Sequence, residues 1–156
     1  MNLIAENLTY KPDEQFHLND VSFNFKKGNL YTILGRTLSG KTTLLKTIAG
    51  LLNPDSGLLK FEEKNFGKIP VWERNVAMVY QQFINYPNYT VYENIASPLA
   101  ITGVKNDEIK QRVGKVAELL KLSAMLNKKP DELSGGQQQR TALARALVKD
   151  LSLIHI

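Results

Sequence analysis

The segment that most constrains the fold of this chain runs from Asn29 to Leu52 and reads NLYTILGRTLSGKTTLLKTIAGLL. Its first part, 30–34, is a short apolar run closed by a glycine, which predicts a strand buried on both faces. Its last part predicts a helix, because apolar residues recur at helical spacing before Gly50 and Pro54 end the pattern. The apolar positions of this helix are Leu44, Leu45, Ile48 and Leu51. A strand, a glycine loop and a helix in this order predict an α/β domain.

The loop of this segment fits the pattern G-x-x-x-x-G-K-[ST], which binds phosphate groups. Glycines let backbone N–H groups curl around phosphate oxygens, and the following helix adds unpaired amides and the positive end of its dipole. We expect Lys41 to reach the β and γ phosphates of a nucleotide, and the Thr42 hydroxyl to take one position on Mg²⁺. The alternative is a glycine loop that merely closes the turn. The residues predicted to contact the nucleotide are Gly35, Arg36, Thr37, Leu38, Ser39, Gly40, Lys41, Thr42 and Thr43.

A second candidate phosphate site is the stretch LSGGQQQR, residues 133–140. Ser134, Gly135 and Gly136 stand where residues 137–148 are predicted to become helical, so they form a helix N-terminus with small side chains and free amides. A chain that binds one ATP already has the first loop for its phosphates. We therefore expect the second site to close over a nucleotide that is held by another copy of the chain. The alternative is a purely structural role, in which Ser134 only caps the helix and the glycines allow tight packing.

With both motifs in this order, the chain resembles the nucleotide-binding subunit of an ABC transporter, from about Asn2 to Asp150. The resemblance implies a P-loop NTPase fold of the α/β class, with a core sheet, an antiparallel β edge and a helical subdomain. It also implies that two subunits sandwich two ATP molecules. Each ATP would lie between the phosphate loop of one subunit and the signature of the other, here Ser134, Gly135, Gly136 and Gln137. The cofactors implied are ATP and Mg²⁺.

The resemblance also predicts a domain division and partners. The core would cover residues 1–85, the helical subdomain 86–135 and the signature helix 136–150, followed by a truncated or foreign tail at 151–156. The partners implied are transmembrane permease subunits and a second nucleotide-binding subunit. The chain would then be a peripheral protein on the cytoplasmic face of the inner (plasma) membrane. The stretch ERNVAMVYQQFINYPNYTVYENIASPL looks most like importers of carbohydrates, glycerol or glycerol phosphate.

A glutamine follows the predicted buried strand 76–80, and it has a role in the same family. The resemblance implies that Gln81 contacts Mg²⁺ and the attacking water; Gln82 is the adjacent alternative, but the register MVYQ favours Gln81. Three nearby tyrosines allow two interpretations, since they either pack the helical subdomain or face the membrane partner. They are Tyr86, Tyr89 and Tyr92.

Two departures limit what the resemblance implies. Family members stack adenine on an aromatic residue after the first strand, and Tyr10 is the nearest candidate here. The family also continues past ALVKD with a strand that ends in an Asp-Glu pair and then a switch histidine, whereas this sequence reads LSLIHI. His155 would fall within the strand and have no catalytic role. We therefore expect this chain to be catalytically incomplete.

Two other stretches have clear periodicity. Residues 2–10 and 16–25 alternate apolar and polar side chains, which predicts two antiparallel strands. The stretch from Asn106 predicts an amphipathic helix with Asn106 as its cap. Its apolar face would contain Ile109, Val113, Val116, Leu119 and Leu120.

Composition bounds the remaining alternatives. The 156 residues include no cysteine, so neither disulfides nor thiolate metal sites are available. The net charge of +5 is spread over scattered lysines, which favours a solvated surface and no nucleic-acid partner. Two other functions stay open: a non-catalytic nucleotide-binding remnant, or a soluble ABC ATPase that acts on ribosomes or DNA.

Overall fold

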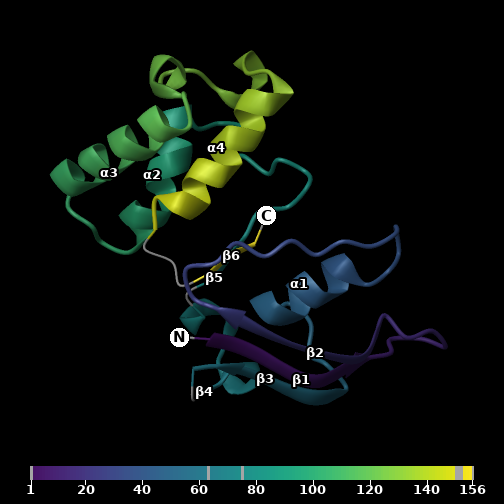
Figure 1. Cartoon of the computed structure of the whole chain (residues 1–156). Helices are drawn as coiled ribbons and strands as arrows, with labels where there is room; N and C mark the ends of the chain where they lie inside the picture. The colour runs from purple at the N-terminus through teal and green to yellow at the C-terminus, as the bar shows by residue number, and fades with distance from the viewer. Residues whose placement is uncertain (1, 63, 75, 150–152, 156) are drawn as a thin grey trace. The chain divides into compact units, whose positions relative to one another are not determined.

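The computed structural model of the chain contains two compact units, Met1–Asn75 and Val76–Ile156, which we call the N-terminal and C-terminal units. It describes residues 2–62, 64–74, 76–149 and 153–155. Helices and strands occur in both units (Figure 1), which confirms the predicted α/β class. The predicted division at residues 85 and 135 stays a prediction. No helix in the described ranges is long and apolar enough to cross a membrane.

An antiparallel sheet is the main element of the N-terminal unit, with strand order β2-β1-β3-β4. Its strands are β1 (Asn2–Tyr10), β2 (Leu18–Lys26), β3 (Ser56–Phe61) and β4 (Lys64–Asn65). The predicted antiparallel pair at the start of the chain is confirmed. Leu3, Ala5 and Leu8 are buried. The inward alternation shifts by one residue after Ala5, where the pairing is irregular and Asn7 has a φ of 52°.

The helix predicted after the glycine loop is α1 (Lys41–Ala49), which lies over one face of this sheet (Figure 1). Leu44 and Ile48 are buried as expected. Leu51 is 46% exposed and lies outside the helix, because Gly50 adopts a φ of 82° and turns the chain away. The inclusion of Leu51 in the helical face was therefore wrong.

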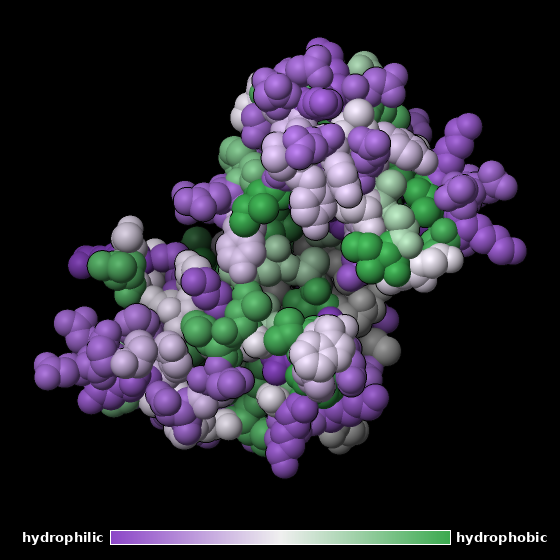
Figure 2. All heavy atoms as spheres, turned by 180° about the vertical axis from the view of Figure 1, so that it is seen from behind, coloured by the Kyte–Doolittle hydropathy of each residue, from purple (hydrophilic) through white to green (hydrophobic). Residues whose placement is uncertain are grey.

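The predicted buried strand at 30–34 is also wrong. These residues form no strand, and Leu30 and Leu34 are 94% and 86% exposed. A buried parallel strand takes its backbone hydrogen bonds from neighbours on both sides. No strand among the described residues pairs with 30–34, so the apolar run has no ladder to join. Exposed apolar side chains of this kind are visible as green spheres at the surface in Figure 2.

Arg74 is buried, with 7% of its surface exposed, and it fastens the end of α1. Its Nε donates to the carbonyl of Ile69 (2.9 Å), and its Nη1 donates to the carbonyls of Thr47 (3.4 Å) and Ile48 (3.2 Å) in the last turn of α1. Its guanidinium also lies 4.8 Å from the centre of the Phe66 ring. Desolvation lowers the pKa of Arg74, while a cation at a helix C-terminus is favoured by the dipole.

We expect Arg74→Met to lower the free energy of unfolding by about 3 kcal/mol, because the last carbonyls of α1 would lose their buried donor. Urea unfolding followed by circular dichroism measures the change. The matched control is Lys68→Met, which replaces a nearby exposed cation and should change stability by less than about 0.5 kcal/mol. Equal unfolding midpoints for the two variants would contradict this role.

The C-terminal unit contains a short parallel sheet and a helical bundle. Strand β5 (Val76–Met78) pairs in parallel with β6 (Leu153–His155). The strand predicted at 76–80 is thus shorter than expected and half-buried, because β6 pairs with only its first three residues. His155 lies in a strand, as predicted. Residues 151, 152 and 156 of the predicted tail lie outside the described residues.

The helices of this unit share one apolar core that includes Val91, Ile95, Val113 and Leu122. They are α2 (Val91–Ile101), α3 (Asn106–Leu119) and α4 (Gly135–Leu147). Short 3₁₀ turns complete the chain: η1 (Phe66–Lys68), η2 (Val71–Glu73), η3 (Ser123–Met125) and η4 (Pro130–Glu132).

The prediction for α3 is confirmed in position but wrong at both ends. Its cap is Lys105 rather than Asn106, which is the first helical residue and makes no side-chain cap. Ile109 and Val113 are buried as expected, whereas Leu119 is 70% exposed. Leu119 ends the helix, and the inward positions of that turn are filled by Ala117 instead.

Candidate functional site

The first candidate site is the phosphate loop, residues 35–43, in the N-terminal unit. Gly40 has a φ of 85°, and a side chain there would collide with the carbonyl oxygen of His17. A side chain at Gly35 would meet Ser39 Oγ at 2.5 Å. Glycine is therefore required at Gly40, by its backbone conformation and by the His17 carbonyl, whereas a side chain at Gly35 would have to displace the Ser39 hydroxyl. Leu38 at the tip has a φ of 66° and is 99% exposed, which shows how tightly the backbone turns.

Free backbone donors lie where the loop becomes α1. Gly40 caps the helix without a side-chain hydrogen bond, and the first turn contains no acidic residue. The first helical hydrogen bond runs from the Leu44 amide to the Gly40 carbonyl (2.8 Å), so the amides of residues 41–43 have no partner within the helix. This end of α1 can accept an anion.

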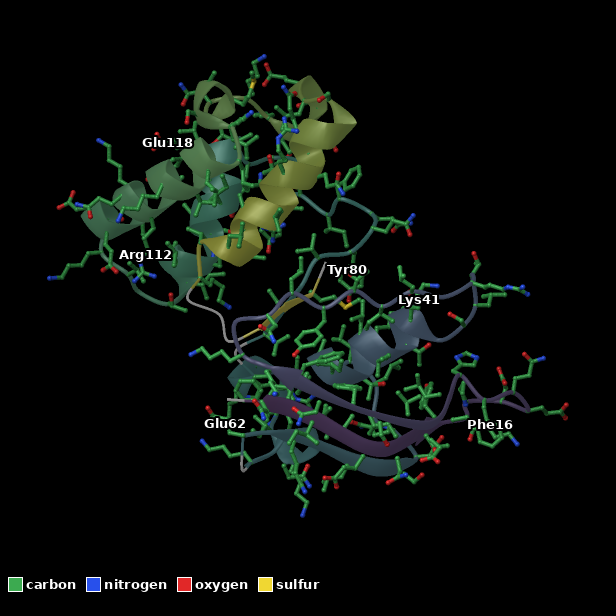
Figure 3. The ribbon with its side chains drawn as sticks, viewed as in Figure 1. Phe16, Lys41, Glu62, Tyr80, Arg112 and Glu118 are labelled. Atoms are coloured by element: carbon green, nitrogen blue, oxygen red, sulfur yellow. The ribbon has the colours of Figure 1, made fainter. Side chains whose placement is uncertain are left out.

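The ammonium of Lys41 lies inside the loop, at the start of α1 (Figure 3). Its Nζ donates to the carbonyls of Gly35 (2.8 Å) and Arg36 (2.6 Å), and it lies 3.4 Å from Ser39 Oγ. The charge is thus held by neutral acceptors that phosphate oxygens can replace. Thr42 is exposed beside it, and its hydroxyl is available to a ligand.

An aromatic side chain next to this loop was missed by sequence reasoning. Phe16, in the turn between β1 and β2 (Figure 3), is 54% exposed, and Lys11 Nζ lies 4.9 Å from the centre of its ring. Tyr10 instead ends β1 and packs edge-on against the His17 ring, with 6.1 Å between centroids. The His17 carbonyl lies where a Gly40 side chain would be, so the chain between β1 and β2 passes beside the phosphate loop. The signal available in the sequence was an aromatic residue inside the polar turn KPDEQFH.

The second candidate site, 134–137, lies at the start of α4 in the C-terminal unit. The Gln137 amide donates to Ser134 Oγ (3.4 Å), and the Ser134 amide donates to Gln137 Oε1 (2.8 Å). Ser134 therefore caps the helix, as one alternative proposed. The other half of that alternative, glycines needed for tight packing, is wrong within the described residues. Side chains at Gly135 and Gly136 would meet Phe83 and Arg140 only at ordinary distances, 3.9 and 3.6 Å.

The residues predicted to act with magnesium divide between the two units. Thr42 belongs to the N-terminal unit, whereas Gln81 is exposed just beyond β5 in the C-terminal unit. Gln82 differs from Gln81 in that it lines a cavity of about 330 Å³ between β5, α2 and α4. The part of the chain described by the structure contains no group of three or more His, Cys, Asp or Glu suited to a metal ion. Thr42 and Gln81 offer neutral oxygens, which fit Mg²⁺ that is also held by nucleotide phosphates.

Comparison with known proteins gives consistent matches. The model of a family described as ABC transporter matches residues 18–156. The glucose import ATP-binding protein GlcV of Saccharolobus solfataricus is 43% identical over 161 residues, covering 99% of this chain and 46% of that protein. The molybdate/tungstate import ATP-binding protein WtpC of Thermococcus kodakarensis is 39% identical over 154 residues, with the same two coverages. The chain thus spans less than half the length of these curated relatives.

A solved structure has the same fold. The dimeric post-hydrolysis state of the ATP-binding cassette MJ0796, bound to ADP and Pi, matches with a TM-score of 0.85 and 31% identity. The match covers 97% of this chain and 72% of that one. It confirms the predicted fold class.

Proposed function

The chain belongs to the ABC transporter family, and we propose on that basis that it is the ATP-binding part of an importer that works as a head-to-tail dimer. The N-terminal phosphate loop of one copy would hold ATP, and residues 134–137 of a second copy would close over its γ phosphate. The similar cassette MJ0796 is described as a dimer bound to ADP and Pi, which supports this arrangement.

The observation that carries this proposal is a pair of exposed glycines at the start of α4 that no neighbouring residue crowds. Gly135 and Gly136 are exposed, have no positive φ and have room for a side chain. Nothing within the described residues therefore requires glycine at either position. A group from outside the chain that approaches the backbone closely would explain why both residues are glycine. The N-terminus of a helix favours an anion as that group.

The chain's own residues divide the work on the nucleotide. Lys41 and the free amides of residues 41–43 would bind and orient the phosphates. Thr42 and Gln81 would hold Mg²⁺, which neutralises phosphate charge when bound. Tyr10 would contact the adenine ring, and the more exposed Phe16 is its competitor for that role.

The cargo would be a sugar, glycerol or glycerol phosphate. The support is the stretch 73–99 and the similarity to a glucose import protein, although the molybdate/tungstate import protein is almost as similar. Permease subunits would complete the importer and place the chain on the cytoplasmic face of the plasma membrane. Co-purification of the protein with candidate permease subunits, followed by uptake assays with labelled glucose, glycerol phosphate and molybdate, tests the cargo.

We expect Gly135→Asp to weaken ATP-dependent dimerisation at least about a hundredfold in a full-length form, because a carboxylate would face the phosphates of the partner's ATP. The same carboxylate favours the N-terminus of α4, so the monomer should fold normally. Sedimentation with a non-hydrolysable ATP analogue measures the dimer.

The matched control for this variant is Gly114→Asp on α3, where a new side chain meets nothing within 4 Å. This control should dimerise like the unsubstituted protein. Equal dimerisation of both variants would sink the sandwich arrangement.

A further inference from the structure

A loop in the C-terminal unit, residues 83–86, is fastened directly to α4. Arg145 Nη1 donates to the carbonyl of Ile84 (2.6 Å), and the Arg145 guanidinium lies 4.2 Å from the centre of the Tyr86 ring. Asn85, which lies between these two residues, donates from its Nδ2 to the carbonyl of Gln138 (3.0 Å), about two turns before Arg145 on α4. The loop thus follows α4 through both its backbone and its side chains.

The same loop is fastened on its other side by α2. Asn94 is fully buried, its Oδ1 accepts from the Tyr86 amide (2.8 Å), and its Nδ2 donates to the carbonyls of Tyr86 (3.1 Å) and Tyr89 (3.0 Å). A buried amide with its hydrogen bonds made fixes the backbone that it contacts. The 83–86 segment is therefore held between two helices and is not free to move alone.

Arg145 is suited to this contact by its chemistry. A guanidinium is planar, so it can donate to a carbonyl and lie over a ring face at the same time, which an ammonium does poorly. Its Nε is buried without a hydrogen-bond partner in the described part of the chain, so the cation is partly withdrawn from water. A partly desolvated cation strengthens both contacts, and their loss should be measurable.

Helix α4 links the contacts of Arg145 with loop 83–86 to the residues at the other end of the helix. Arg145 lies in the last turn of a helix that begins at Gly135. A helix of this length is about 20 Å long and moves as a rigid rod. The loop that follows Gln81 and the helix end that presents Ser134 and Gly135 are therefore joined mechanically.

We propose that Arg145 is a positioning residue that locks loop 83–86 to α4, so that the loop and the signature end of the helix move as one body. That this serves the ATP site rests on the proposed function. The lock itself is a property of the chain alone, so it can be tested without nucleotide.

Hydrogen exchange in the 156-residue chain tests the lock. In Arg145→Met, the amides of Asn85, Tyr86 and Tyr89 should exchange at least about tenfold faster, and those of Gln137 and Gln138 at least about threefold faster. Amides in the middle of α3 should keep their rates. The matched control is Lys115→Met, an exposed cation on α3, which should change none of the loop or α4 amides.

Conservative and double variants separate positioning from stability. Arg145→Lys should give an intermediate exchange rate, because one donor remains while the ring contact is lost. With Tyr86→Leu, the effect of Arg145→Met on loop exchange should shrink, because the two residues share one contact. Loop rates equal to the control would overturn the proposal, as would faster loop exchange with unchanged Gln137 and Gln138. A uniform rise that includes α3 would also overturn it, since that is a global loss of stability.

Dimerisation distinguishes this inference from the proposed function. In a full-length form, Arg145→Met should weaken dimerisation with the ATP analogue about tenfold while nucleotide affinity at the phosphate loop stays unchanged. If the unsubstituted protein does not dimerise with nucleotide, the proposed function fails, and the exchange result alone decides the role of Arg145.

Discussion

Replacing Lys41 with alanine should lower the affinity of the chain for ATP at least about a hundredfold, to below detection in an ordinary titration. The Lys41 ammonium now lies on the carbonyls of Gly35 and Arg36, and phosphate oxygens would replace these acceptors with charged ones. Losing charge-assisted hydrogen bonds of this kind costs roughly 3 kcal/mol. Isothermal titration with MgATP measures the affinity.

The control for this prediction is Lys46→Ala, which removes a half-buried cation from the last turn of the same helix, away from the loop. It should bind ATP within about threefold of the unsubstituted chain. Circular dichroism establishes that both variants are folded. Equal affinities for Lys41→Ala and the unsubstituted chain would show that the glycine loop only closes a turn.

The 156-residue chain should release phosphate from ATP at the background rate, at least about a hundredfold more slowly than a full-length relative. Hydrolysis needs a group that can accept a proton from the attacking water, and Gln81 offers only a neutral amide. The described residues contain no carboxylate or histidine cluster that would hold the metal in its place. A phosphate-release assay with purified chain measures the rate.

Contamination by other ATPases is the main confounder of such an assay, and Lys41→Ala supplies the control. Release that is equal in the two chains is background and agrees with the prediction. Release that matches a full-length relative and disappears in Lys41→Ala would show that these residues catalyse hydrolysis by themselves. Gln81→Ala would then establish whether the glutamine takes part.

Local patterns predicted the helices that begin at the two candidate phosphate sites. The serine before Gly135 is a start signal that acts within one turn, and α4 begins two residues before its predicted start. Helix α1 begins at Lys41, three residues before Leu44, the first apolar position of its predicted face. The pairing of β1 with β2 was equally readable, because a short polar turn joins two alternating strands. In each case the interacting residues are close in sequence.

Strand pairing and burial that involve segments far apart in the sequence could not be predicted from local patterns. The apolar run 30–34 has the pattern of a buried strand, yet a pattern supplies no neighbouring strand, and Leu30 and Leu34 are exposed. Arg74 and Arg145 are ordinary cations in the sequence. Only the fold shows that Arg74 donates to the carbonyl of Ile48, 26 residues earlier, at the end of α1. In the same way, only the fold shows that Arg145 donates to the carbonyl of Ile84, 61 residues earlier.

The sequence by itself therefore determined the two candidate phosphate-binding motifs, the helices that follow them and the family, since each depends on residue order over a few turns. The tertiary structure decided which glycines are required and which are open. A collision at Gly40 comes from His17, more than twenty residues earlier, whereas no described neighbour crowds Gly135 or Gly136. Whether a glycine is needed depends on which atoms surround it, and only folding brings those atoms together.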